Sequence, residues 1–166
     1  MWWWRRVRNH TYWDPGANQH PDGLPYYVHD VALRRQHNEE GLSCFSVADD
    51  SEADRVTHYC ALTLYGYDNL DYLLIPDDTW DGFGLRPIHV PMPNIHPYLS
   101  TRHYEVRGLT EELEARLAQT ILGHTGRKAC RAKKGHILEI AQRYLREDST
   151  LSECLNGEWA AKLASR

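Results

Sequence analysis

Histidine is abundant in this sequence, with ten residues among 166, and it is the side chain best suited to bind a metal or to move protons near neutral pH. His89, His96 and His103 recur every seven residues, but the prolines between them rule out one helix that carries all three and would break a strand. His58 and Cys60 are two apart on a predicted helix, so they do not face one site. No HExxH motif and no tetrahedral zinc spacing is present. The sequence therefore predicts no bound metal.

The segment Gly41-Leu42-Ser43-Cys44-Phe45 is the place where a nucleophile could lie. It lacks the second glycine of a nucleophile elbow, and a cysteine on a strand is more often a small buried apolar residue than a reactive thiol. Gly82-Phe83-Gly84 lacks the third glycine and the helix of a dinucleotide-binding fingerprint, and no phosphate-binding loop motif occurs. The familiar motifs of nucleophilic catalysis and nucleotide binding are therefore missing.

A basic run between two predicted helices could bind phosphate groups. Within residues 127–134 it holds five positive charges: Arg127, Lys128, Arg131, Lys133 and Lys134. The phosphates could belong to a nucleotide, a nucleic acid or a partner protein. No aromatic residues interleave with the run to stack on bases, and the lysines of a solvated loop would give the same pattern. We expect a weak phosphate site at most, with nucleic acid the less favoured ligand.

The order of the remaining polar residues is informative. His29 lies on a predicted strand, and Ser43 and Ser46 lie on a second strand that leads into a helix containing Tyr59. Glu105 lies on a late strand. This order resembles the ADP-ribosyltransferase superfamily, in which a first-strand His or Arg holds NAD and a Ser- or Tyr-containing segment lines the nicotinamide pocket. A late-strand Glu there supports an oxocarbenium-like transition state.

The resemblance covers roughly residues 25 to 108 and implies NAD as a substrate, while the sequence establishes no cofactor. It assigns catalysis to Glu105 and His29, and substrate binding to Ser43 or Ser46 and to Tyr59. The family's usual Ser-Thr-Ser is missing, and the residue two before Glu105 is His103 and not an acid. We add His103 as a catalytic candidate, because a histidine-rich face suits acid–base chemistry near neutral pH, and Arg107 as a substrate-binding one. The alternative is an ordinary exposed strand pair between Glu105 and Arg107.

The elements that would position these residues indicate a single α+β domain. Strands are expected at Trp2–Arg8 (an edge strand), 26–33, 42–47, 70–75 (a central strand), 86–90 and 103–107. A capping-box pattern at 51–54 starts a helix that ends near Gly66, and the proline-rich middle should hold no helix. Further helices are expected from Thr110, over 136–146, and from Thr150. We therefore expect a mixed or mostly antiparallel sheet with one helix in residues 1–109 and three helices in residues 110–166.

Composition limits the partners and the compartment. The net charge of −4 argues against general affinity for nucleic acid or membrane surfaces, and no apolar run approaches a membrane span. The N-terminus lacks the pattern of a secretory signal, and the four cysteines form no CxxC pair, so a cytoplasmic protein with free thiols is expected. The consecutive tryptophans Trp2 to Trp4 should be covered, either by their own domain or by a protein partner such as a second copy of the chain.

Two hypotheses for function remain open on the sequence. The first is a small intracellular enzyme that acts on a nucleotide-type substrate, most concretely by NAD-dependent ADP-ribosyl transfer in the manner of a toxin or effector. The second is a non-catalytic protein-binding module, such as an immunity, adaptor or antitoxin-like protein, in which bipolar charge and exposed aromatic residues would serve an interface. Convergence of His29, Glu105 and a serine would favour the enzyme.

Overall fold

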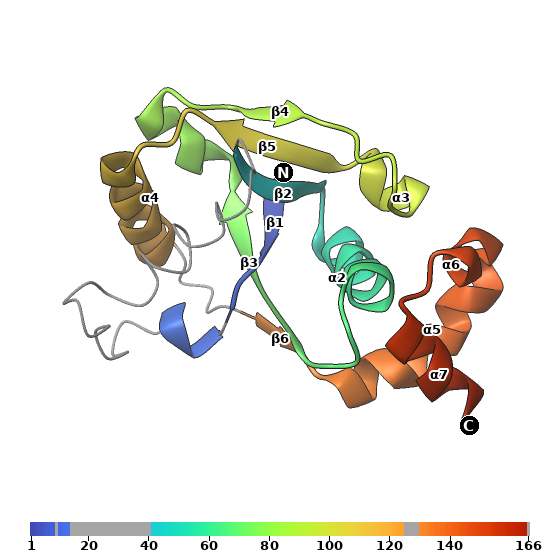
Figure 1. Ribbon diagram of the computed structural model, residues 1–166. Coiled ribbons are helices and arrows are strands. Elements are labelled where there is room, and N and C mark those ends of the chain that lie inside the picture. The colour runs from blue at the N-terminus through green and yellow to red at the C-terminus, as the bar shows by residue number, and fades with distance from the viewer. Residues whose placement is uncertain (9, 14–40, 125–129, 166) are drawn as a thin grey trace.

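A six-stranded antiparallel sheet organises the protein in the computed structural model, which describes residues 1–8, 10–13, 41–124 and 130–165 (Figure 1). The strand order is β4-β5-β2-β1-β3-β6. The strands are β1 (Trp2–Arg6), β2 (Gly41–Val47), β3 (Leu70–Pro76), β4 (Pro87–His89), β5 (His103–Arg107) and β6 (Cys130–Ala132). The α+β class is therefore confirmed, while the strand expected at 26–33, with His29, lies outside the described residues.

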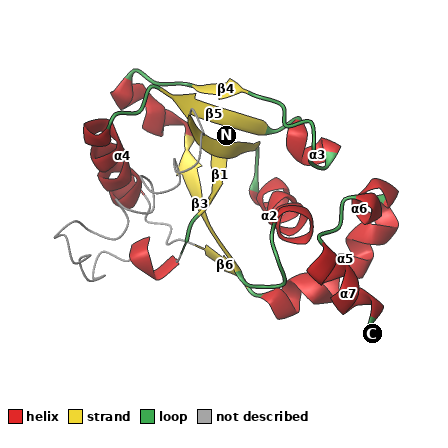
Figure 2. Ribbon diagram, viewed as in Figure 1, coloured by secondary structure: helices red, strands yellow, loops and turns green. Residues whose placement is uncertain are grey.

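Helices lie on both faces of this sheet (Figure 2). One core contains residues of α2 (Asp50–Leu64), α3 (Pro97–Ser100), α5 (Lys134–Glu147), α6 (Ser149–Glu153) and α7 (Gly157–Ala164). The other core contains residues of α4 (Glu111–His124) and of the 3₁₀ helices η1 (His10–Trp13) and η3 (Asp77–Phe83). We call these two sides the α2 face and the α4 face of the sheet.

The tryptophan run forms the strand β1, which lies between β2 and β3, so the expected edge position is wrong. Alternation along the strand buries Trp3 on the α4 face and Trp4 on the α2 face. Both indole N–H groups have hydrogen-bond partners: Trp3 donates to the half-buried Asp77 at 2.7 Å and Trp4 to the buried Thr57 at 2.8 Å. Because the domain itself covers Trp3 and Trp4, these two rings offer no surface to a partner or to a second copy.

Helix α2 begins at a capping box two residues earlier than the sequence pattern predicted. The side chain of Asp49 accepts the backbone N–H of Glu52 at 2.9 Å, and the carboxylate of Glu52 accepts the N–H of Ala48 at 2.9 Å. Three residues of α2, namely Ala53, Val56 and Cys60, then face the core as predicted. The start of α4 also follows the prediction, since the hydroxyl of Thr110 accepts the N–H of Leu113 at 3.3 Å.

Three local expectations need correction. The proline-rich middle does contain helices, η3 and the single turn α3, because no proline falls inside η3 and Pro97 stands at the first turn of α3. The last third is not purely helical, since β6 pairs with β3. Its final helix is divided into α6 and α7. No helix within the described ranges is both long enough and apolar enough to cross a membrane.

Candidate functional site

The pairing of β2 with β5 brings several predicted residues together. The antiparallel register sets Ser43 opposite Glu105 and Phe45 opposite His103. Because alternate residues of a strand share a face, Ser43, His103 and Glu105 lie on one side of the sheet, next to Phe45 on the α2 face. The residues between them, such as Cys44, point into the core on the α4 face. We call Ser43, His103, Glu105 and Arg107 the β2–β5 cluster.

The imidazole of His103 is held at both nitrogens. Its Nδ1 lies 2.6 Å from the carbonyl oxygen of Val90, which can only accept, so Nδ1 carries the proton. In the neutral ring Nε2 is then an acceptor, and the hydroxyl of Ser43 donates to it. His103 is only 3% exposed, whereas Ser43 is half-buried. The arrangement orients the serine oxygen and leaves its lone pairs available to a ligand.

Glu105 stands beside this pair at the edge of the core. Its carboxylate oxygen Oε2 accepts from Arg107, with Nε at 3.1 Å and Nη2 at 3.0 Å. The two side chains are 18% and 43% exposed, so the ion pair contributes little to stability. The strand pair expected as the alternative therefore exists, and it fixes the carboxylate of the residue that pairs with Ser43 in the sheet. A fixed negative charge on one strand and an oriented hydroxyl on the paired residue of the next is an arrangement that can act on a positively charged reaction centre.

Cys44, adjacent to Ser43, is not part of this chemistry. Its side chain lies on the opposite face, and burial raises the pKa of the thiol to about 12. The thiolate, which is the reactive form, is therefore not populated at neutral pH. The sequence prediction of a small buried apolar residue is confirmed.

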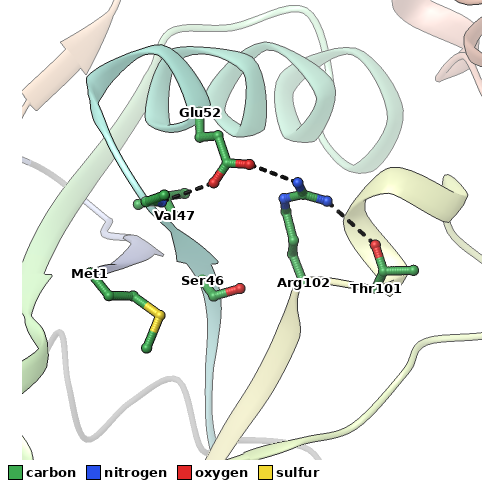
Figure 3. A pocket seen from close by; sticks show the side chains of 7 residues that line it. Met1, Ser46, Val47, Glu52, Thr101 and Arg102 are labelled. Atoms are coloured by element: carbon green, nitrogen blue, oxygen red, sulfur yellow. Dashed lines mark hydrogen bonds and ion pairs between the residues drawn. The ribbon is translucent and has the colours of Figure 1, made fainter.

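Ser46 lies on the other side of β2 from Ser43, because the two are three positions apart. It pairs with Trp3 in the sheet and lines a pocket at the end of β2 (Figure 3). Ser46 therefore does not join the β2–β5 cluster, contrary to the expectation that either serine could serve the same site.

Tyr59 belongs to a different group of residues. Its hydroxyl donates to Oδ2 of Asp148 at 2.9 Å, and Nε2 of His96 lies 3.3 Å from the same oxygen. Burial, followed by the Asp148 contact, raises the pKa of Tyr59. We call Tyr59, His96 and Asp148 the helical cluster. It connects α2 to the starts of α3 and α6. The structure therefore does not bring Tyr59 into the β2–β5 cluster, and its role in substrate binding stays a prediction.

The basic run does not form a common phosphate site in the described part of the chain. Arg131 makes two hydrogen bonds to the buried Asp71, at 2.7 Å and 2.8 Å, and thereby attaches β6 to β3. Burial would raise the pKa of Asp71, but the hydrogen bonds from Arg131 and from the backbone N–H of His10, together with the charges of those two residues, outweigh it and lower the pKa. Lys133 and Lys134 are exposed at the start of α5, with Nζ of Lys134 5.3 Å from the ring centre of Tyr67. Arg127 and Lys128 lie outside the described residues.

The three histidines spaced by seven have separate environments. His89 is exposed on β4 with its ring against Tyr104, His96 caps α3, and His103 is buried on β5. Within the described ranges, no group of three or more His, Cys, Asp or Glu residues could hold a metal ion.

Sequence reasoning missed two features of the site. The carbonyl group of Val90 decides which ring nitrogen of His103 carries the proton, and no sequence signal marks a backbone acceptor. The ion pair between Glu52 and Arg102, 50 residues apart in the chain, lines the pocket of Figure 3. Comparison with protein-family models, with curated proteins and with solved structures finds no match. The geometry of the β2–β5 cluster and of the pocket in Figure 3 is therefore the basis for assigning a function.

Proposed function

We propose that the protein is a small enzyme that acts on a nucleotide-type substrate at the β2–β5 cluster, with NAD-dependent ADP-ribosyl transfer as its reaction. The observation that carries the proposal is the register of β2 against β5, which sets Ser43 directly opposite Glu105. The family resemblance implies that a serine of this strand and a late-strand glutamate share one site, and these two residues fit that description. His29, the third member, lies outside the described residues.

Glu105 would supply the electrostatic part of the reaction. In ADP-ribosyl transfer the bond between the ribose carbon and the nicotinamide nitrogen breaks, and the electron pair leaves with nicotinamide. A carboxylate held close to the ribose stabilises the positive charge that develops there. The acceptor, or water, then attacks the ribose carbon and gives up its proton to a base. Glu105 is held by Arg107 and is part exposed, so it combines a fixed position with access to a ligand.

Ser43 and His103 would orient the substrate. Because the Ser43 proton is directed to Nε2 of His103, the serine oxygen is an acceptor for a ligand donor. The carboxamide N–H of nicotinamide and the ribose hydroxyls are donors of this kind. The pair therefore acts on binding and alignment, whereas Glu105 acts on the transition state.

One observation favours the alternative of a binding module. Ile88 is 51% exposed on β4, which is an edge strand of the described sheet. An exposed edge can accept an extended segment of a partner as an additional strand. At three residues β4 is short for that role, so we favour the enzyme.

The test uses the full chain and measures two quantities, NAD affinity by titration calorimetry and nicotinamide release by chromatography. Glu105→Gln keeps the shape and removes the charge, and should lower turnover by about 10²- to 10³-fold while NAD still binds, as losing one preorganised group does. Glu112→Gln, an exposed glutamate on α4, is the matched control and should behave as wild type.

Water is an acceptor in every sample, so a wild type that neither binds NAD nor releases nicotinamide at millimolar NAD would contradict the proposal. An active wild type with an equally active Glu105→Gln would remove Glu105 from the mechanism. If NAD is not bound and Ile88→Lys abolishes capture of a purified partner, the binding module is the correct function.

A further inference from the structure

A pocket of 320 Å³ lies where β2 ends and α2 begins (Figure 3). Its volume falls at the lower end of the range of small-molecule sites, about 300–1,000 Å³. It is lined by Met1, Ser46, Val47, Ala48, Glu52, Thr101 and Arg102. The pocket is separate from the β2–β5 cluster, because the side chains of Ser46 and Ser43 project from opposite faces of the same strand.

The charged residues of this pocket are held in place before any ligand binds. Arg102 donates to Oε1 of Glu52 at 2.7 Å, and Oε2 of Glu52 accepts the backbone N–H of Ala48 at 2.9 Å. The guanidinium carbon of Arg102 also lies 4.0 Å from the ring centre of Tyr98. The hydrogen bond from Arg102, followed by that from Ala48, lowers the pKa of Glu52, so the carboxylate is charged at neutral pH. A ligand therefore meets a preorganised pair of opposite charges.

This pair favours one ligand chemistry over others. Because Glu52 neutralises Arg102, the side chains of the lining have no excess of positive charge that would select a phosphate. It offers an acceptor and a donor side by side, which fits two adjacent hydroxyl groups. A carboxylate is the group that proteins use to accept a hydrogen bond from a ribose 2′-hydroxyl. Within the described residues the hydroxyl of Ser46 has no hydrogen-bond partner, so it is available to the same ligand.

The apolar part of the lining fits the rest of such a ligand. Met1 is 61% exposed at the mouth of the pocket, whereas Val47 is buried in the core, so Met1 supplies the apolar surface. Methionine is flexible and polarisable, so it can pack against a sugar ring or the face of a base. Figure 3 shows Met1 on one side of the pocket and Arg102 with Thr101 on the other, with Ser46 between them.

We propose that this pocket is a second binding site, specific for the vicinal diol of a pentose, as in the ribose of a nucleoside. Glu52 accepts from one hydroxyl and Arg102 donates to the other, while Ser46 contacts the ring or its 5′ position. The site binds its ligand whether or not the β2–β5 cluster acts on NAD.

Ligand-observed NMR and calorimetry on the full chain test the proposal with adenosine, 2′-deoxyadenosine, D-ribose and inorganic phosphate. Adenosine should bind about tenfold more tightly than 2′-deoxyadenosine, the effect of one hydrogen bond to a charged group. Binding of D-ribose would show that the sugar alone is recognised, and its failure beside binding of adenosine would show that the base is needed. Phosphate should neither bind at this site nor compete.

Ser46→Leu fills the pocket and should abolish adenosine binding, while Ser152→Leu, an exposed serine on α6, should leave it unchanged. Thermal unfolding of both variants checks that each is folded. Nicotinamide release by Ser46→Leu should equal that of wild type, which separates this site from the proposed function. Equal affinity for adenosine and 2′-deoxyadenosine, displacement by phosphate, or full binding by a folded Ser46→Leu would each overturn the proposal, as would a wild type that binds none of these ligands.

Discussion

Two buried histidines of this protein have opposite hydrogen-bonding arrangements. In the β2–β5 cluster, Nδ1 of His103 donates to the carbonyl of Val90 and Nε2 accepts from the hydroxyl of Ser43. In the helical cluster, Nδ1 of His96 accepts the backbone N–H of Tyr98 at 3.2 Å, so its proton is on Nε2, which faces Asp148. The two rings therefore carry their protons on different nitrogens.

The difference separates a structural group from one that can do chemistry. His96 and its partners connect three elements, since His96 caps α3 and Asp148 caps α6 through the N–H of Thr150. Every contact of the helical cluster is used to hold helices together. In the β2–β5 cluster the ring of His103 is equally buried, but its partner Ser43 is half-buried and stands across from Glu105. Burial alone therefore does not distinguish the two; the partners of the ring do.

The largest effect on stability is expected from Asp148→Ala. This change removes the acceptor of Tyr59, leaves His96 facing no charge and deletes the cap of α6. The free energy of unfolding should fall by about 2–4 kcal/mol, from a lost cap and a lost buried hydrogen bond. Urea unfolding followed by circular dichroism measures it.

The matched control for this change is Glu153→Ala, an exposed residue of the same helix, which should stay within about 0.5 kcal/mol of wild type. NAD turnover per folded molecule should not change in Asp148→Ala. A stable Asp148→Ala with impaired turnover would reverse the roles of the two clusters.

A smaller effect on stability, but a clear one on activity, is expected from Ser43→Ala. Loss of the hydroxyl leaves Nε2 of His103 without its donor, at a cost of about 1 kcal/mol in unfolding free energy. Turnover of NAD should drop by about tenfold or more, mainly through KM, because the serine orients the substrate in the proposed reaction. Urea unfolding measures the loss of stability, and steady-state kinetics on the same preparation measures the loss of turnover. Full activity in a destabilised Ser43→Ala would show that the hydrogen bond between Ser43 and His103 serves stability only.

The smallest effect concerns pH. Burial lowers the pKa of His96 and of His58, while in the unfolded chain histidine titrates at about 6.5. Below that value the unfolded chain binds more protons than the folded protein, so stability falls as pH is lowered from 7 to 5. Melting temperatures should show this decline, and the double variant His58→Gln with His96→Gln should flatten it. The control variant His89→Gln, at an exposed histidine, should show the same decline as wild type. A wild-type melting temperature that stays constant from pH 7 to 5 would contradict the lowered pKa values of His58 and His96.

The elements of the fold could be predicted from the sequence where the signal was local. The strand at 70–75 was marked by an apolar run and the first long helix by a capping-box pattern at 51–54, and both elements are present, the helix with its cap at Asp49. The central position of the Trp2–Arg6 strand was not predictable, because its two neighbours lie about 40 and 70 residues away in the chain. The strand β6 was missed because its pairing depends on Arg131 reaching Asp71.

The candidate site was predicted only in part, because residue types and their order are local signals whereas the positions of the side chains depend on long-range packing. Glu105, His103 and Ser43 were chosen by residue type and order, and the register of β2 against β5 then placed them on one face. Tyr59 was assigned to the same site but faces Asp148, since the packing of α2 against α5, whose C-cap is Asp148, decides where it points. The pocket at Ser46 requires three separate segments to meet, which no local pattern encodes.

The central claim, that the β2–β5 cluster and not the helical cluster meets the substrate, can be tested by nitrogen NMR of the histidine side chains with and without NAD. In the free protein, His103 should show its proton on Nδ1 and His96 on Nε2. On addition of NAD the resonances of His103 should shift, while those of His96 stay in place. The same tautomer for both rings, or a shift confined to His96, would contradict the account.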